Sequence, residues 1–331
     1  MEDRARCLGV TDLRVSPFGL GCARIGGIFK REPGEFLNLL SAALDAGITF
    51  FDTADIYSQG ESETLLGRAF KHRRDAVVIA SKVGYVLPAQ RRIVARLKPF
   101  VRPVIRLLGI RRQHLSAAVR GALAQDFSSA HLRRAVEGSL KRLGTDRLDL
   151  LQLHSPSAAV VERGECIQTL DDLKREGKIR YYGVACESME AAVAAMRHPR
   201  VSTIQVTINL LEQGAVDALL PMARERRVGI IARECLANGL LVKDAASIDL
   251  MSYSQSPQQA EHRREEIESY RASAAKEGCT LAQLALQFVS RLEDVSVSLI
   301  GVSGRQQLDG LLSMGILDFP SPAGRIDLGR P

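Results

Sequence analysis

The stretch Gly47-Ile-Thr-Phe-Phe-Asp52-Thr-Ala-Asp-Ile-Tyr57-Ser-Gln-Gly-Glu-Ser-Glu63 contains the structural unit that decides the fold. Its short apolar run predicts a buried strand, which ends next to the carboxylate of Asp52. Tyr57 follows five residues later at the head of a loop, and a helical pattern begins at Ser62. The stretch therefore predicts a strand, a loop that carries polar side chains, and a helix, in that order.

The same unit recurs along the chain, because short apolar segments alternate with longer amphipathic ones. We expect strands at Phe18–Gly21, Ile48–Phe51, Val77–Ser81, Leu148–Leu153, Arg180–Val184, Thr203–Val206, Gly229–Ala232 and Val297–Ile300. We expect helices at Glu35–Ala46, Ser62–Lys71, Ser129–Leu143, Cys166–Glu176, Ser188–Met196, Gly214–Arg226, Arg263–Lys276, Thr280–Arg291 and Arg305–Met314. Alternation of this kind is typical of a parallel sheet with crossover helices. Eight units in 331 residues favour an α/β fold of the closed (β/α)8 TIM-barrel type over two open sheets.

No linker divides the chain, so we expect a single domain over residues 1–331, with a hairpin at Cys7–Val15 that caps the barrel floor. Between Val86 and Gln125 there are many Arg and Lys residues and no acidic residue. Because this segment follows the third strand, residues 86–128 are expected to form a basic insertion on the catalytic face of the barrel. Three interpretations stay open: a solvated helical excursion, a lid that attracts an acidic substrate, and an amphipathic surface that contacts a membrane or a partner.

Composition excludes several classes of protein. The net charge of +7 favours an anionic ligand, but the absence of Trp and the 5% of aromatic residues argue against a nucleic-acid-binding platform. No apolar run is long enough for a membrane span, and the first residues lack the apolar core of a secretory signal, so we expect a cytoplasmic protein. The six cysteines show no CxxC spacing and predict free thiols, with no disulfide framework and no metal site.

Four side chains are expected to meet at one end of the barrel. Asp52 ends the second strand, Tyr57 lies in the loop that follows, Lys82 ends the third strand, and His154 ends the fourth. In a parallel barrel the carboxyl ends of all strands share one face, so these residues converge although they are distant in sequence.

Their chemical types fit the reduction of a carbonyl group. Tyrosine has an ordinary pKa of about 10 and needs a stabilised phenolate to act near neutral pH. A lysine ammonium beside the phenol stabilises the ionised form, and Asp52 is expected to pair with Lys82. His154 is expected either to orient the carbonyl oxygen or to share the proton transfer.

These residues and several further motifs, in this order, closely resemble the aldo-keto reductases. The resemblance runs from about Leu13 to Leu312, nearly the whole chain. Its further motifs are Ser139–Gly144, Arg147–His154, Gly177–Val184, Ile204–Asn209, Ile231–Leu241 and Leu281–Ala285. The resemblance implies an NADPH-dependent oxidoreductase, with NADH as the alternative cofactor, in which Tyr57 is the general acid and base and Asp52, Lys82 and His154 complete the catalytic set.

The resemblance also implies the residues that bind the cofactor. Gln205 matches the glutamine that binds the nicotinamide carboxamide, and Arg233 stands at the position that backs the nicotinamide ring. The pyrophosphate loop corresponds to Leu236, Asn238 and Gly239, and the region that grips the adenosine 2′-phosphate and adenine corresponds to Gly301, Ser303, Arg305 and Gln307. A short helix that begins near Arg305 would present free backbone N–H groups to a phosphate.

Near the site the chain also departs from the family pattern. Ala185 and Cys186 stand where relatives have a Ser and, nearby, an Asn, Arg233 replaces a common aromatic residue, Cys235 replaces a proline, and Leu311 replaces an Asn that contacts adenine. Cofactor binding is therefore expected to be weaker or arranged differently.

Residues of the first strand and the cysteines near the strand ends are further candidates. In the segment Gly19-Leu-Gly21-Cys22, the glycines are expected to let the cofactor or substrate approach the first strand closely, and they do not form a Rossmann fingerprint. Cys22, Cys186 and Cys235 are expected to line the site, as small apolar side chains rather than as nucleophiles.

Three functions follow as hypotheses. The first is hydride transfer between a nicotinamide cofactor and an aldehyde, a ketone or a sugar-like hydroxyl, by a monomer that acts on a small-molecule carbonyl or alcohol substrate. The second is a cofactor-binding regulatory or scaffold protein, and the third is a biosynthetic enzyme that reduces a carbon–carbon double bond. The fold alone does not choose among them.

Overall fold

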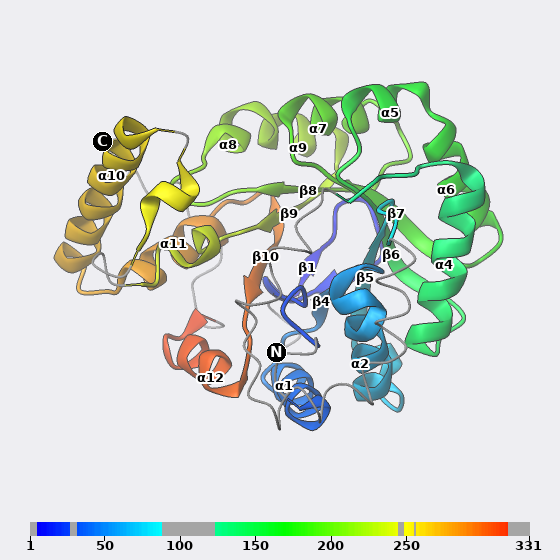
Figure 1. The fold of residues 1–331 in the computed structure, drawn as a ribbon, viewed down its shortest axis with the longest axis horizontal. Coiled ribbons are helices and arrows are strands. Elements are labelled where there is room, and N and C mark those ends of the chain that lie inside the picture. Colours follow the sequence, from blue (N-terminus) through cyan, green and yellow to red (C-terminus); the bar gives the residue numbers. More distant parts are fainter. Residues whose placement is uncertain (1–4, 27–31, 88–122, 244–247, 255, 317–331) are drawn as a thin grey trace.

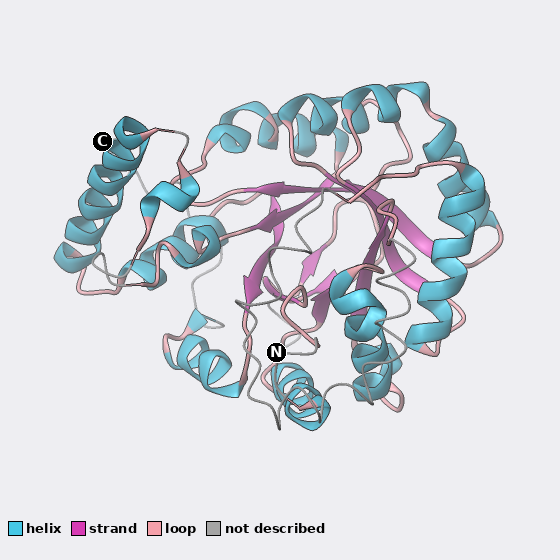
Figure 2. Ribbon diagram, viewed as in Figure 1, coloured by secondary structure: helices cyan, strands magenta, loops and turns pink. Residues whose placement is uncertain are grey.

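The structure, a computed structural model, describes residues 5–26, 32–87, 123–243, 248–254 and 256–316. Eight parallel strands close into a barrel in the order β10-β3-β4-β5-β6-β7-β8-β9, and helices surround them (Figures 1 and 2). The strands are β3 (Phe18–Gly21), β4 (Phe50–Asp52), β5 (Val78–Val83), β6 (Leu148–His154), β7 (Ile179–Ala185), β8 (Thr203–Thr207), β9 (Gly229–Arg233) and β10 (Val295–Gly301). This closed parallel barrel confirms the predicted (β/α)8 fold.

The helices lie between and after the strands, as the alternation predicts. They are α1 (Pro33–Asp45), α2 (Glu61–Phe70), α4 (Ser129–Leu143), α5 (Ala158–Arg163), α6 (Glu165–Arg175), α7 (Met189–Met196), α8 (Gly214–Ala218), α9 (Leu220–Arg226), α10 (Pro257–Lys276), α11 (Leu281–Ser290) and α12 (Arg305–Ser313). Short 3₁₀ turns occur at Tyr57–Gly60, Arg74–Ala76, Ala237–Gly239 and Leu250–Tyr253. Helix α10 lies outside the main ring, beside α11 (Figure 1).

The helices depart most from the sequence-based prediction at three places, where one helix is divided, one begins earlier and one is additional. The helix expected at Gly214–Arg226 is divided into α8 and α9, because Pro221 in the first turn of α9 cannot continue an existing hydrogen-bonded helix. Helix α10 begins at Pro257 and not at Arg263. Ser256 caps this start by accepting a hydrogen bond from the amide of Gln259. Helix α5 was not predicted.

The barrel has two apolar cores, one on each face of its strands. Side chains alternate along each strand, so Phe51 and Leu151 pack outward against the helices while Phe50 and Leu150 fill the interior. This double burial explains why the strands read as continuous apolar runs. Gly19 is part of the inner packing, since a Cβ there would lie 2.8 Å from side-chain atoms of both Phe50 and Val297.

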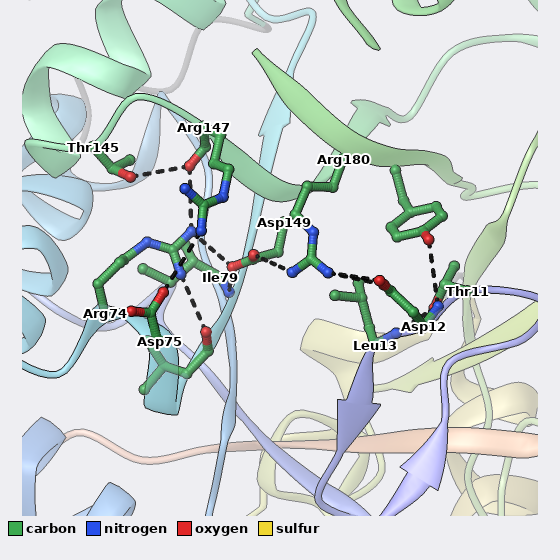
Figure 3. Close-up of polar contacts among 12 residues, drawn as sticks. Thr11, Asp12, Leu13, Arg74, Asp75, Ile79, Thr145, Arg147, Asp149 and Arg180 are labelled. Carbon is green, nitrogen blue, oxygen red and sulfur yellow. Dashed lines mark hydrogen bonds and ion pairs between the residues drawn. The ribbon is translucent and has the colours of Figure 1, made fainter. Parts of the chain in front are cut away.

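The predicted hairpin closes the barrel floor. Strands β1 (Arg6–Cys7) and β2 (Arg14–Val15) pair antiparallel, and Leu8, Leu13 and Val15 belong to the inner core. A polar network fixes the hairpin to the strands beside it (Figure 3).

In this floor network the buried carboxylate of Asp149 on β6 pairs with Arg74 at 2.7 Å and with Arg180 of β7 at 3.1 Å. Arg180 in turn pairs with Asp12 of the hairpin at 2.9 Å.

The predicted insertion at 86–128 lies mostly outside the described residues, which omit 88–122. Its two ends lie side by side just after β5. Tyr85 bridges Gln125, and the amide of Val86 donates to the carbonyl oxygen of Ala124 at 2.8 Å. Both ends therefore leave the barrel at the carboxyl end of β5.

Candidate active site

The ends of β4, β5 and β6 bring together three of the four residues predicted to act in catalysis, and the loop after β4 adds the fourth. Lys82 is buried and forms an ion pair with Asp52. Its ammonium also donates to the hydroxyl oxygen of Tyr57 at 3.4 Å. The ring of His154 packs edge-on to the ring of Tyr57, with centroids 5.9 Å apart. The four side chains therefore form one cluster at the mouth of the barrel.

Two glutamines from other strands of the barrel hold Asp52. Gln152 of β6 and Gln205 of β8 each donate to Oδ1 of Asp52, at 3.1 and 3.0 Å, while Lys82 binds Oδ2. Besides its bonds to Asp52 and Tyr57, the Lys82 ammonium donates to the carbonyl oxygen of Thr53 at 3.1 Å. Asp52 thus keeps Lys82 charged and fixed next to Tyr57.

Gln152 was not among the predicted site residues, although the sequence contains a signal for it. It is a polar residue in an apolar strand and lies two positions before His154. Because side chains alternate along a strand, residues two apart point to the same face.

Burial and charge determine the protonation of Tyr57. Burial raises the pKa of Tyr57, and this effect outweighs the ammonium of Lys82, which lowers it; Asp52 adds to the rise. The expectation that Lys82 makes the phenolate accessible near neutrality is therefore only partly right: Lys82 acts in the predicted direction, but the pKa stays above its ordinary value. Tyr57 is a neutral phenol at neutral pH and can donate its proton.

Lys82 remains an ammonium despite its burial. Burial alone would lower the pKa of Lys82, but Asp52 and Tyr57 outweigh that effect and raise it.

His154 is a neutral imidazole. Burial, together with the charges of Lys82 and Arg233, lowers the pKa of His154 to about 3. Its Nδ1 is buried and has no hydrogen-bond partner among the described residues. Tyr85 packs edge-on against the ring with centroids 4.8 Å apart, and the Gln125 amide donates to the backbone carbonyl of His154 at 3.2 Å. A neutral, fixed imidazole is suited to orient a carbonyl oxygen rather than to supply a proton as a cation.

The opposite side of the mouth is formed by β7, β8 and β9. Ala185 ends β7, and the amide of Cys186 donates to the carbonyl oxygen of Gln205 at 2.8 Å. Arg233 ends β9 and extends across β8, so that its Nη2 donates to the carbonyl oxygen of Cys186 at 3.2 Å. The Nε of Arg233 is buried and has no partner in the part of the chain that the structure describes.

The cysteines near the strand ends are neutral thiols. Burial raises the pKa of Cys186 to about 12 and that of Cys235 to about 12, and it raises the pKa of Cys22 as well. Since the thiolate is the nucleophile, none of the three is poised for covalent catalysis.

The loop after β9 has an unusual backbone. Glu234, Ala237 and Asn238 have positive φ values of 57°, 45° and 54°, and Gly239 has 99°. The Asn238 amide donates to the carboxylate of Glu234 at 2.9 Å, and the Asn209 amide donates to the Glu234 carbonyl at 3.1 Å. Non-glycine residues in this conformation cost free energy and concentrate at functional sites. Asn209 and Glu234 were quoted only within longer motifs and were not predicted as site residues.

The segment after β10 contains the last group of predicted residues. Gly301 ends β10, and the predicted helix begins at Arg305, directly after Gly304. Three of the side chains have protein partners: Gln307 accepts hydrogen bonds from the amide and the hydroxyl of Ser303, and Arg305 pairs with Asp309 at 2.6 Å.

The glycines near the barrel mouth differ in how much space a side chain would have at each position. A Cβ on Gly21 would meet only the Ile300 carbonyl at 3.5 Å, and a Cβ on Gly301 would meet nothing within 4 Å. Gly19, by contrast, is required by the inner core of the barrel, so the single explanation offered for both glycines of β3 is wrong for Gly19.

The described residues contain no group of three His, Cys, Asp or Glu side chains arranged to hold a metal ion. No described helix combines the length and the apolar character needed to cross a membrane.

Comparisons with known proteins agree with the fold. The model of the aldo/keto reductase family matches residues 17–321. The uncharacterized oxidoreductase YqkF of Bacillus subtilis (strain 168) is 30% identical over 242 residues, which is 72% of this chain and 67% of that protein.

Solved structures give the same result. The aldo-keto reductase AKR11C1 from Bacillus halodurans, in its holo form, has a TM-score of 0.76 and 25% identity, covering 97% of this chain and 92% of that one. An aldo-keto reductase from Klebsiella pneumoniae in complex with NADPH has a TM-score of 0.66 and 23% identity, with coverage of 97% and 92%. The chain belongs to the aldo/keto reductase family of oxidoreductases.

Proposed function

We propose that this protein transfers a hydride between NADPH and an aldehyde, a ketone or a sugar-like hydroxyl, with Tyr57 as the group that donates or accepts the proton. The observation that carries the proposal is the contact between Tyr57 and the buried ammonium of Lys82, which Asp52 holds in place. A phenol next to a fixed cation is an acid whose conjugate base is stabilised where it forms.

Several features of the barrel mouth fit a nicotinamide nucleotide. Gly21 and Gly301 leave open backbone at the ends of two adjacent strands, and the N-terminus of α12 follows the second of them. The buried Nδ1 of His154 and Nε of Arg233 lack partners among the described residues, as expected where a ligand completes the site. The Klebsiella pneumoniae relative is in complex with NADPH, and the Bacillus halodurans relative is in its holo form.

When bound, the reduced nicotinamide supplies the hydride. His154 and Tyr57 hold the carbonyl oxygen, and the Tyr57 O–H donates its proton to that oxygen as negative charge develops there. Lys82 stabilises the phenolate that remains, and Asp52 keeps Lys82 positioned. In the reverse direction the Tyr57 phenolate accepts the proton of the alcohol.

The test combines binding and turnover on the full chain. NADPH and NADH are titrated by calorimetry into the wild type, Tyr57→Phe and the control Tyr85→Phe, and turnover is then measured with a panel of aldehydes, ketones and aldoses. The control removes a second phenol, whose ring also packs against His154. Tyr57→Phe is expected to bind nucleotide like the wild type and to lose about 10²- to 10⁴-fold in kcat, whereas Tyr85→Phe loses far less.

Two outcomes contradict the proposal. If neither nucleotide binds to the wild type, the cofactor assignment is wrong. If Tyr57→Phe turns over as fast as the wild type, Tyr57 is not the proton donor. Nucleotide binding by the wild type without turnover of any carbonyl would instead favour a cofactor-binding regulatory protein.

A further inference from the structure

The mouth of the barrel has two halves with different charges and roles. Tyr57, Lys82 and His154 belong to the half formed by β4, β5 and β6. Arg233 belongs to the other half, where its side chain extends from the end of β9 over β8 to the residue that follows β7. The side chain is only 25% exposed.

The position of the proton donor dictates where a hydride must come from. Tyr57 and the neutral His154 hold the carbonyl oxygen, so the carbonyl carbon points away from them, toward β7, β8 and β9. A hydride donor has to approach that carbon to within about 3–3.5 Å. A bound nicotinamide ring would therefore lie on the side of the mouth that carries Arg233, as the resemblance to the aldo-keto reductases also implies.

The charge of Arg233 acts across the whole mouth. It lowers the pKa of His154, although burial and Lys82 contribute more. It also opposes the rise that burial produces in the pKa of Cys186 and of Tyr57. The positive charge of the guanidinium thus affects the pKa of groups on β6, on the loop after β4 and at the end of β7.

We infer that Arg233 sets the balance between the two redox forms of the bound cofactor, because its charge disfavours the oxidised nicotinamide relative to the reduced one. The oxidised ring carries a positive charge, and hydride uptake at C4 makes it neutral, so only the oxidised form is repelled. This inference rests on the proposed function. The protein binds NADPH more tightly than NADP⁺, and NADP⁺ leaves readily after carbonyl reduction.

The preference for NADPH over NADP⁺ also affects the equilibrium between the bound reactants and the bound products. Because binding and chemistry form a thermodynamic cycle, weaker binding of NADP⁺ shifts the bound equilibrium toward NADPH and the carbonyl compound.

One neighbouring group partly neutralises Arg233. The Glu234 carboxylate lies 3.5 Å from Nη1 and is held by the amide of Asn238. Removing the charge of Arg233 and removing the charge of Glu234 must therefore change the cofactor balance in opposite directions. A change caused only by altered packing would not have this property.

The test measures the ratio of the dissociation constants of NADP⁺ and NADPH by calorimetry. Arg233→Met is expected to lower the ratio about tenfold, since a unit charge a few ångströms away exceeds that effect even after partial screening. Glu234→Gln is expected to raise the ratio, and Arg233→Lys, which keeps the charge, to leave it near the wild-type value. Arg305→Met is the control. NADP⁺ and NADPH carry the same phosphates, so a change in phosphate binding alters both dissociation constants equally and leaves their ratio unchanged.

The possible outcomes are distinguishable. If both nucleotides bind and the ratio is the same in the wild type, Arg233→Met and Glu234→Gln, this inference is wrong while the proposed function stands. If the wild type binds neither nucleotide, the proposed function fails and the inference fails with it. If Arg233→Met does not fold, as judged by thermal melting, Glu234→Gln decides the question: a raised ratio supports the inference, and an unchanged ratio contradicts it.

Discussion

At the scale of single residues, the site depends on buried charges that are fully partnered. Asp52 accepts hydrogen bonds from Lys82, Gln152 and Gln205, which come from three different strands. Burying an ion pair is costly unless further hydrogen bonds satisfy it, and Asp52 meets that condition. The positions of Lys82 and, through it, Tyr57 are therefore set before any substrate arrives.

Asp55, in the loop that carries Tyr57, is a partly exposed residue whose carboxyl group has less compensation than that of Asp52. Its Oδ1 has no hydrogen-bond partner among the described residues. Burial and the nearby Glu63 raise the pKa of Asp55 to about 7, although Arg142 and the amide of Ile56 act in the opposite direction. In the unfolded chain the group titrates near 3.8.

The stability linked to Asp55 is therefore expected to fall with rising pH. Between about pH 4 and pH 7 the folded protein holds a proton that the unfolded chain releases, so deprotonation favours unfolding across this window. Urea unfolding of the wild type and Asp55→Asn at pH 5, 6 and 7.5 tests this. The stability of the variant relative to the wild type should increase by about 1–2 kcal/mol over that range.

Asp146→Asn, which changes a side chain 84% exposed, is the matched control and should give only a small difference at each pH. If the difference between Asp55→Asn and the wild type is the same at all three pH values, the buried carboxyl is not protonated in the folded state.

Residue-scale prediction from sequence succeeded for side chains at strand ends and failed for their partners. Asp52, Lys82 and His154 could be placed together because parallel strands end on one face. Gln152 and Asn209 were missed, because a supporting hydrogen bond depends on which strands the closed barrel brings within reach of each other and how far they are shifted. That information is contained in the register of the closed barrel, not in local sequence.

At the scale of elements, the floor network attaches the β1–β2 hairpin to the barrel through Asp149 (Figure 3). The carboxylate of Asp149 is buried and also accepts a hydrogen bond from the amide of Ile79 at 2.9 Å. It holds Arg180, which in turn binds Asp12 of the hairpin at 2.9 Å. The buried side chain of Asp149 is thus the centre of the polar contacts that hold the hairpin, beside the apolar contacts of Leu8, Leu13 and Val15.

Asp149→Asn is expected to destabilise the protein by about 2–3 kcal/mol, because Arg74 and Arg180 lose a buried counter-charge while remaining partly solvated. Asp75→Asn is the control in the same network: Asp75 pairs with Arg147 at 3.6 Å, and its side chain is 94% exposed, so the expected loss is below about 0.5 kcal/mol. Equal losses in the two variants, measured by urea unfolding, would contradict the role assigned to Asp149.

Elements were predicted best where periodicity extended over many residues. Helix α4, of 15 residues, has the predicted bounds and has both a Ser128 cap and a left-handed Gly144 at its end. The four-residue strand β3 also has the predicted bounds, although it is too short to show a period. Helix α5 is only 6 residues long, too short for a periodic pattern to stand out. The division at Pro221 and the start at Ser256-Pro257 correspond to turn and cap signals, which an apolar pattern alone does not contain.

At the scale of the whole molecule, the barrel makes a chemical site from residues that lie far apart in the sequence. The carboxyl ends of β4, β5 and β6 supply the proton-donor half, and β7, β8 and β9 supply the half that carries Arg233. Closure of the barrel was predictable from eight alternating units in one chain. Substrate choice was not, because in this architecture it depends on loops between strands and helices.

The most direct test of hydride transfer uses isotopically labelled cofactor. The wild type is incubated with the carbonyl panel and with each of the two C4-deuterated epimers of NADPH, and the alcohol products are analysed by mass spectrometry. A nicotinamide bound in a fixed orientation at the barrel mouth presents one face to the substrate. Deuterium should therefore appear on the former carbonyl carbon from one epimer only. Alcohol products that contain no deuterium from either epimer would contradict hydride transfer at this site.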